Sequence, residues 1–190
     1  MATIISDRVY TPDDLRHMPE GERFELVNGQ LVEREMGAFA CWIVSLINAK
    51  LTTFVVEHSL GMVFSSETQY QCFADDPRRI RKPDVSYVQR GRITPEMMHG
   101  YVRLAPDLVV EVVSDNDLYY EVETKVREFL LAGVRVVWVL NPATNSVRVH
   151  RAVGNSTDLS SEDRLTGEDV LPGFSVSVGE LFPALPGEAG

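Results

Sequence analysis

Cysteine is scarce in this sequence of 190 residues, and its pattern excludes two kinds of architecture. Cys41 and Cys72 lie far apart and form no CxxC pair, so neither a disulfide framework nor a zinc site is indicated. We expect both thiols to lie in the core. The histidines are scattered without the spacing of metal ligands, at His17, His58, His99 and His150. Catalysis based on histidine or cysteine is therefore not favoured.

Long hydrophobic runs are also missing. We find no segment that approaches the roughly 18 apolar residues of a membrane span, and no basic start followed by an apolar stretch. We therefore expect a cytoplasmic protein without membrane contact. The hydrophobic content of 44% is enough for one sizeable core. We expect a single domain over residues 1–183 and a frayed tail at 184–190.

Positive charge is in short supply, with 18 Lys and Arg against 28 Asp and Glu and a net charge of −10. Because nucleic-acid binding usually draws on a basic footprint, this total argues against nonspecific DNA affinity. Residues 75–103 have the opposite charge balance, with seven basic and four acidic residues. That stretch is either a nucleic-acid contact or a solvated loop.

The first half of the chain contains a strong turn signal. Asn28-Gly29, between the apolar stretches 23–27 and 30–33, predicts a tight type I′ hairpin. Thr11-Pro12 before it predicts the start of a short helix. Residues 39–57 lack glycine and proline and predict a largely buried helix, and residues 62–73 predict a long strand. The helix stripe that we expect in the core is Trp42, Ile43, Leu46, Ile47 and Leu51.

The second half contains a strand-helix-strand unit, which indicates a parallel pair in an α/β core. We expect strands at 107–113 and 134–140 and a helix at 118–132 that ends at Gly133. Asp115 or Asn116 is the predicted helix cap. An antiparallel strand is expected at 146–151 and a surface loop at 154–164.

Glu111 is out of place in this pattern, because all its neighbours in Leu108-Val109-Val110-Glu111-Val112-Val113 are typical of a buried strand. A buried carboxylate must be paired, hydrogen-bonded or bound to a metal. Alternation puts Glu111 on the face of Val109 and Val113. Two partners are available: Asp84, in the short strand 83–88, and Lys125, at the edge of the apolar stripe of the next helix.

These three residue types suit a divalent-metal site. Mg²⁺ or Mn²⁺ prefers a few oxygen ligands, which Asp84, Glu111 and the carbonyl of Val112 would supply. Lys125 would then orient the attacking water or offset charge on a phosphate. Plainer interpretations remain open: Asp84 as a cap of the turn after Pro83, and Lys125 as the partner of Glu121 on the helix surface.

A family resemblance is carried by stretches that follow one another along the chain: Phe24-Glu25-Leu26-Val27-Asn28-Gly29, Arg81-Lys82-Pro83-Asp84-Val85, Ala105-Pro106-Asp107 with the Glu111 strand, Lys125, Ala132-Gly133-Val134 to Asn141-Pro142, and Leu171-Pro172-Gly173-Phe174. Taken together they cover nearly the whole chain. This ordered set resembles the Uma-two family, whose members are described as restriction endonucleases of the PD-(D/E)XK nuclease-like fold. The resemblance implies a mixed central sheet flanked by helices, with an N-terminal β-hairpin.

The resemblance also implies a function, a Mg²⁺-dependent endonuclease acting on DNA. It places metal ligands at Asp84 and Glu111 and the catalytic lysine at Lys125, with Glu25 either a further acidic contributor or a solvent-facing strand residue. The usual lysine two residues after the glutamate is Val113 here. Catalysis would therefore depend on Lys125 acting from the helix.

A second class of function remains open, a nuclease-like scaffold that has lost catalysis and serves in binding or assembly. The strong negative charge and the lack of a recognisable DNA-reading module favour this alternative. The apolar hairpin and the first long helix are either core or an interface between two copies, so a homodimer also stays open. An acyl hydrolase is disfavoured because no GxSxG elbow is present.

Overall fold

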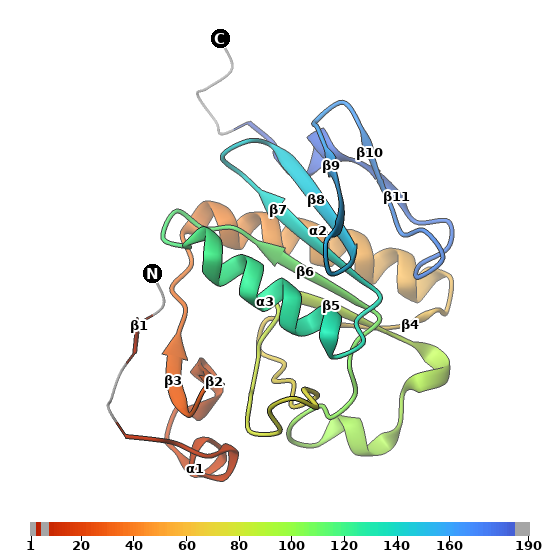
Figure 1. The fold of residues 1–190 in the computed structure, drawn as a ribbon. Helices are drawn as coiled ribbons and strands as arrows, with labels where there is room; N and C mark the ends of the chain where they lie inside the picture. The colour runs from red at the N-terminus through yellow and green to blue at the C-terminus, as the bar shows by residue number, and fades with distance from the viewer. Residues whose placement is uncertain (1–2, 5–7, 185–190) are drawn as a thin grey trace.

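The computed structural model describes residues 3–4 and 8–184, and its main feature is a central six-stranded sheet (Figure 1). The strand order is β4-β5-β6-β7-β8-β9, with β6 and β7 parallel and the other neighbours antiparallel. The strands are β4 (Gly61–Ser65), β5 (Val85–Gln89), β6 (Leu108–Val112), β7 (Val136–Asn141), β8 (Ser146–Ala152) and β9 (Asn155–Leu159). The mixed α/β fold class is confirmed.

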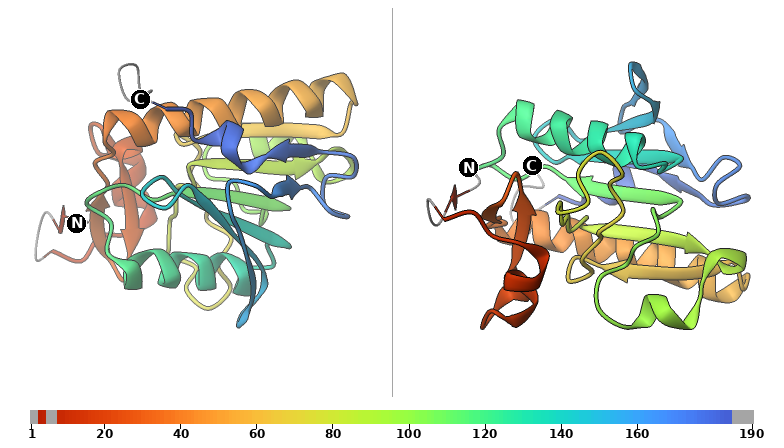
Figure 2. Two further views of the ribbon diagram at one scale, coloured as in Figure 1. Left: turned by 90° about the horizontal axis from the view of Figure 1, so that it is seen from above. Right: turned by 60° about the horizontal axis from the view of Figure 1, so that its bottom comes forward.

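Two helices cover opposite faces of this sheet, α2 (Ala38–Glu57) on one side and α3 (Tyr119–Leu131) on the other (Figure 2). Two small antiparallel sheets complete the fold, one of β1 (Thr3–Ile4), β3 (Gln30–Glu33) and β2 (Phe24–Val27), the other of β10 (Arg164–Thr166) and β11 (Ser175–Ser177). The short helices are α1 (Pro12–His17), η1 (Gly21–Arg23), η2 (Arg90–Arg92), η3 (Pro95–Met98) and η4 (Val178–Leu181).

The hairpin and the first helix form as their sequences predict. Asn28 and Gly29 have φ angles of 52° and 77°, and positive values at both central residues are what a type I′ turn requires. Thr11 caps α1, because its hydroxyl accepts the Asp14 backbone N–H while the Asp14 carboxylate accepts the backbone N–H of Thr11. Local signals therefore fix this part of the fold.

Alternation along β6 divides the core in the expected way. Leu108, Val110 and Val112 lie in the core cluster beneath α2. Val109 lies on the opposite face, packed with Val126 and Phe129 of α3. Glu111 consequently faces the α3 layer.

The prediction that α2 is largely buried was wrong, because only one stripe of it packs on the sheet: Ala40, Ile43, Ile47, Leu51 and Val55. Trp42 from the predicted stripe is 40% exposed, Leu46 is only partly buried, and Cys41 is exposed rather than a core thiol. By length and composition alone α2 is apolar enough to cross a membrane, which corrects the expectation that no segment comes close. Its buried stripe packs as that of a core helix.

Three predicted segments also needed correction. The strand expected over 62–73 ends at Ser65, and Tyr70 bridges instead to Arg81 and Val102. The surface loop expected at 154–164 contains β9, an edge strand that is polar because solvent reaches most of its side chains. The cap of α3 is Leu118, without a side-chain bond, rather than Asp115 or Asn116. Residues 185–190 of the expected tail lie outside the described part of the chain.

Candidate active site

The two predicted acids meet at the edge between two neighbouring strands. Asp84 immediately precedes β5, and the antiparallel register of Val85 with Val110 places it beside Glu111 on β6. Asp84 is 4% and Glu111 2% exposed. The Asp84 carboxylate accepts the backbone N–H of Val112 at 2.6 Å. Asp84 therefore does more than cap a turn, because it anchors the strand that carries its partner.

Lys125 reaches one of these two acids, Glu111, from the middle of α3. Its amine lies 3.0 Å from Glu111 Oε2 and 3.0 Å from Glu25 Oε1, and it donates to the carbonyl of Lys82 at 2.7 Å. The side chain is buried although it is charged. A lysine held in this way is not the helix-surface partner of Glu121.

Glu25 is buried on β2, so its interpretation as a solvent-facing residue was wrong. Its second oxygen accepts from Arg81 at 2.8 Å, and Arg81 also bonds Glu128 of α3 at 2.7 Å. Arg79 contacts the other Glu128 oxygen at 3.3 Å. Part of the basic stretch 75–103 is therefore internal, and neutralises buried acids rather than facing a ligand.

Arg34 is the residue that sequence reasoning missed. Its Nη1 lies 3.1 Å from both Asp84 Oδ1 and Glu111 Oε2, and its Nη2 donates to the carbonyl of Val112 at 2.9 Å. The guanidinium also forms a two-pronged pair with Asp117, through Nε at 3.1 Å and Nη2 at 2.5 Å. Arg34 directly follows β3, and nothing in its local sequence indicates where its side chain points.

Burial and ion pairing shift the pKa values of Glu111 and Glu25 in opposite directions. Burial raises the pKa of Glu111 to about 7, with Lys125 opposing the shift and Asp84 adding to it. Burial would raise the pKa of Glu25 as well, but Lys125 and Arg81 outweigh it and lower that pKa to about 2. Of the two acids that contact Lys125, Glu25 is therefore the one whose pKa is held low.

The depressed pKa of Glu25 predicts a contribution to stability. We expect Glu25→Gln to lower the free energy of unfolding at pH 7 by about 3 kcal/mol, the equivalent of a shift from 4.5 to about 2. Because the folded-state pKa is the lower one, this contribution is present above pH 4.5 and is lost as the pH falls toward 2. Urea unfolding of both proteins from pH 7 downward measures it.

The control for this prediction is Glu20→Gln, which removes an exposed hairpin-side carboxylate paired with Arg23 at 2.7 Å. Exposed pairs contribute up to about 1 kcal/mol, so this variant should resemble the parent protein across the pH range. A Glu25→Gln variant whose stability deficit is as small as that of the control would contradict the assignment.

The donor atoms at the centre of the site suit a hard divalent cation. The Asp84 and Glu111 carboxylates both accept from Nη1 of Arg34, and the carbonyl of Val112 accepts from the neighbouring Nη2, so the three groups surround the end of the guanidinium. Glu111 Oε1 is buried and, within the described residues, has no hydrogen-bond partner. Across those same residues no three acidic, histidine or cysteine side chains cluster closely enough to hold a metal alone. Two carboxylates and a carbonyl match Mg²⁺, which keeps several water ligands.

A cavity of about 200 Å³ opens beside these groups, between the hairpin and α3. Its lining includes Glu111, Lys125, Arg34 and the exposed ring of Tyr120. It therefore gives a small ligand group access to Glu111 and Glu25 from the α3 side.

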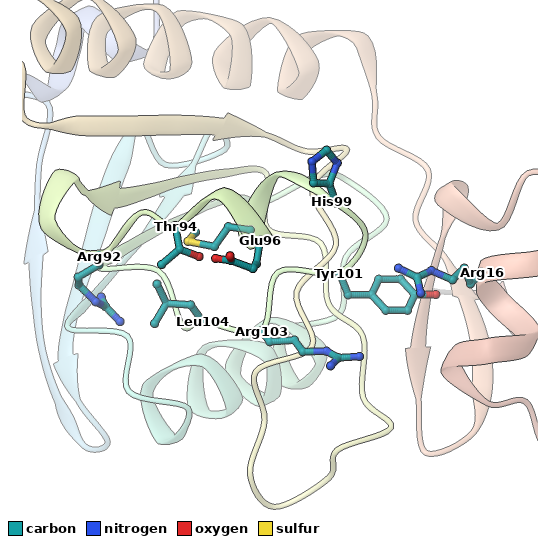
Figure 3. A pocket seen from close by; sticks show the side chains of 9 residues that line it. Arg16, Arg92, Thr94, Glu96, His99, Tyr101, Arg103 and Leu104 are labelled. Atoms are coloured by element: carbon teal, nitrogen blue, oxygen red, sulfur yellow. The ribbon is translucent and has the colours of Figure 1, made fainter.

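A larger cavity of about 470 Å³ lies away from the acids (Figure 3). Arg92, which follows β5 at the end opposite Asp84, borders it and pairs with Asp107 at 2.6 Å. Figure 3 shows Arg16 approaching the Tyr101 ring, with the guanidinium carbon 5.6 Å from the ring centre, and Arg103 pointing outward. Arginine side chains therefore border this cavity, but none of the predicted catalytic residues lines it.

A mixed sheet between two helix layers, with buried acids on adjacent strands and a lysine on the following helix, defines the restriction-endonuclease-like class of nuclease fold. The chain belongs to the Uma2 (Uma-two) family, described as "Putative restriction endonuclease", whose model matches residues 12–179. The sequence-based family assignment is thereby confirmed.

A solved structure shares the fold. It is described as "a putative nuclease belonging to DUF820" and comes from Anabaena variabilis ATCC 29413. It is 20% identical and superposes with a TM-score of 0.77, covering 90% of this chain and 97% of the other. No curated protein matches this sequence.

Proposed function

We propose that this protein is a metal-dependent endonuclease that hydrolyses phosphodiester bonds in DNA. The observation that carries the proposal is the position of the buried Glu111, which pairs with Lys125, shares Arg34 with Asp84 and lines a cavity. Family membership supports a nuclease. The identity of the metal, the nucleic acid and the role of each residue are our inference.

The proposed roles follow from the contacts. Asp84 and Glu111, with the carbonyl of Val112, would hold Mg²⁺ or Mn²⁺. When bound, such an ion polarises a phosphoryl group and lowers the pKa of a water molecule. Lys125 would orient the attacking water and offset the charge that develops on the phosphate. Glu25 positions Lys125 by pairing with its amine, and Arg81 holds Glu25 in place by pairing with the other carboxylate oxygen.

Substrate binding needs positive charge outside the buried network. The exposed residues Arg16 and Arg103, which line the cavity in Figure 3, would meet this need. Because phosphate contacts of this kind release counterions, DNA affinity should fall steeply with salt.

The direct test is cleavage of supercoiled DNA by the full chain with Mg²⁺, Mn²⁺ or a chelator. We expect cleavage only with metal, and a rate at least about tenfold lower in Asp84→Asn at fixed Mg²⁺, because an amide oxygen is a neutral and weaker ligand. Asp115→Asn, which changes an exposed residue of the loop after β6, is the control and should keep the parent rate.

Parallel reactions with RNA decide between the two nucleic acids. If neither nucleic acid is cut in the presence of metal, the enzymatic proposal is wrong and the alternative of a binding scaffold stands. Cleavage that persists unchanged in Asp84→Asn would equally contradict the assigned site.

A further inference from the structure

The Arg34 guanidinium lies where the proposed metal ligands meet. Three groups bond it, the Asp84 carboxylate, the Glu111 carboxylate and the carbonyl of Val112, at distances of 2.9 to 3.3 Å. These are the same three groups that would coordinate Mg²⁺. The arginine thus neutralises the negative charge of the two acids, as a bound metal ion would.

A metal ion and this guanidinium cannot share the position. Both would lie between the same oxygens of Asp84 and Glu111, and two cations in contact repel strongly in a buried setting of low dielectric constant. Lys125 already supplies one positive charge to Glu111 Oε2, the oxygen that Arg34 contacts. A third cation at that oxygen would need one of the others to leave.

The contacts of Arg34 show how it could leave. Its Nη1 contacts the two acids, its Nη2 bonds both the carbonyl of Val112 and Asp117, and its Nε pairs with Asp117 alone, which lies in the loop before α3. Asp117 is held by its own bond from the Ser114 backbone N–H at 2.8 Å. The arginine therefore has a fixed anionic partner outside the metal ligands, and its side chain is more exposed than those of Asp84 and Glu111, at 21%.

We propose that Arg34 is a built-in cation that occupies the metal position, so that a divalent ion binds only when the guanidinium moves away from Asp84 and Glu111 while it keeps Asp117 as its partner. The inference rests on the proposed function in assigning Asp84, Glu111 and Val112 as ligands. It goes beyond that function in two respects. In the metal-free protein, Arg34 neutralises the charge of the two acids, and the same residue sets the affinity for metal.

The test is calorimetric titration of the full chain with Mn²⁺ alone, without nucleic acid. We expect Arg34→Met to bind Mn²⁺ at least about tenfold more tightly than the parent, because no internal cation competes. Arg34→Met should also melt at a lower temperature without metal, since its acids are left to repel each other, and should gain more thermal stability from Mn²⁺ than the parent does.

Arg23→Met is the matched control. It removes another arginine next to the same hairpin, one that pairs with Glu20 and Glu33 on the surface. Its Mn²⁺ affinity should equal that of the parent. If Arg34→Met does not fold, Arg34→Lys replaces it, because a shorter ammonium cannot span Asp84, Glu111 and Asp117 together, and it should bind Mn²⁺ more tightly than the parent.

The outcomes separate this inference from the proposed function. Tighter binding in the Arg34 variant supports the inference, including the case in which the parent binds no Mn²⁺ and cuts no DNA. Equal or weaker binding in the variant overturns the inference, even if the parent cleaves DNA with metal. Absence of Mn²⁺ binding in every variant overturns both.

Discussion

Replacing Lys125 by methionine is expected to slow metal-dependent DNA cleavage by about a thousandfold at saturating Mg²⁺. Methionine keeps most of the side-chain length but removes the ammonium that lies 3.0 Å from Glu111. An electrostatic group directed at the charge of the transition state contributes about a hundred- to a thousandfold in a water-excluded site. Single-turnover cleavage of supercoiled DNA measures the rate of the chemical step.

The prediction separates a catalytic role from a structural one by its effect on metal binding. Lys125→Met should bind Mn²⁺ at least as tightly as the parent, because it loses a competing positive charge, while its cleavage rate collapses. Arg127→Met, which removes an exposed charge from the same helix, is the control and should keep the parent rate. A Lys125→Met variant that is folded, binds metal and cuts DNA normally would remove the lysine from the mechanism.

Replacing Arg81 by methionine is expected to have the largest effect on stability, a loss of about 3–5 kcal/mol in the free energy of unfolding at pH 7. Arg81 is buried between the carboxylates of Glu25 and Glu128, at 2.8 Å and 2.7 Å. Removing one member of a buried ion pair leaves an uncompensated charge, and losses of this size are typical. Urea unfolding monitored by circular dichroism gives the value.

The pH dependence of the Arg81 effect provides a second check. Arg81 helps to lower the pKa of Glu25, so without the guanidinium that pKa rises, the Glu25 carboxyl can protonate, and the deficit should shrink as the pH falls from 7 toward 4. The control is Arg78→Met, an exposed arginine from the same stretch whose nearest acid, Asp76, is 3.9 Å away. Its stability should stay within about 0.5 kcal/mol of the parent. An equal loss in both variants would show that the buried network does not contribute as proposed.

The elements that carry strong local signals were predictable from the sequence. Asn28-Gly29 defines its turn because positive φ angles favour these residues, and the apolar strand around Glu111 allows only one face for the acid once alternation is applied. The position of Lys125 followed from the helical period and the resemblance together. The first two of these inferences need only neighbours in the chain.

The rest of the site depends on contacts between distant segments, which local patterns do not encode. Arg34 reaches Asp84 and Glu111 only because the hairpin docks beside the central sheet, where Leu26 and Ile80 exchange backbone hydrogen bonds of 2.9 Å and 2.8 Å. Glu25 lies on the same hairpin, and its burial has the same cause. The polar β9 was taken for a loop because an edge strand with solvent on its side chains lacks an apolar face.

The hairpin that supplies Glu25 and Arg34 belongs to a different sheet from the one that bears Asp84 and Glu111. The proposed centre is therefore assembled between two sheets, with Asp84 and Glu111 contributed from one and Arg34 and Glu25 from the other. A shift of the small sheet would change the distances of Arg34 and Glu25 from Glu111 and Lys125 together. Hydrolysis at the proposed site would thus depend on how the β2–β3 hairpin docks beside the central sheet, although the two proposed metal ligands lie outside the hairpin.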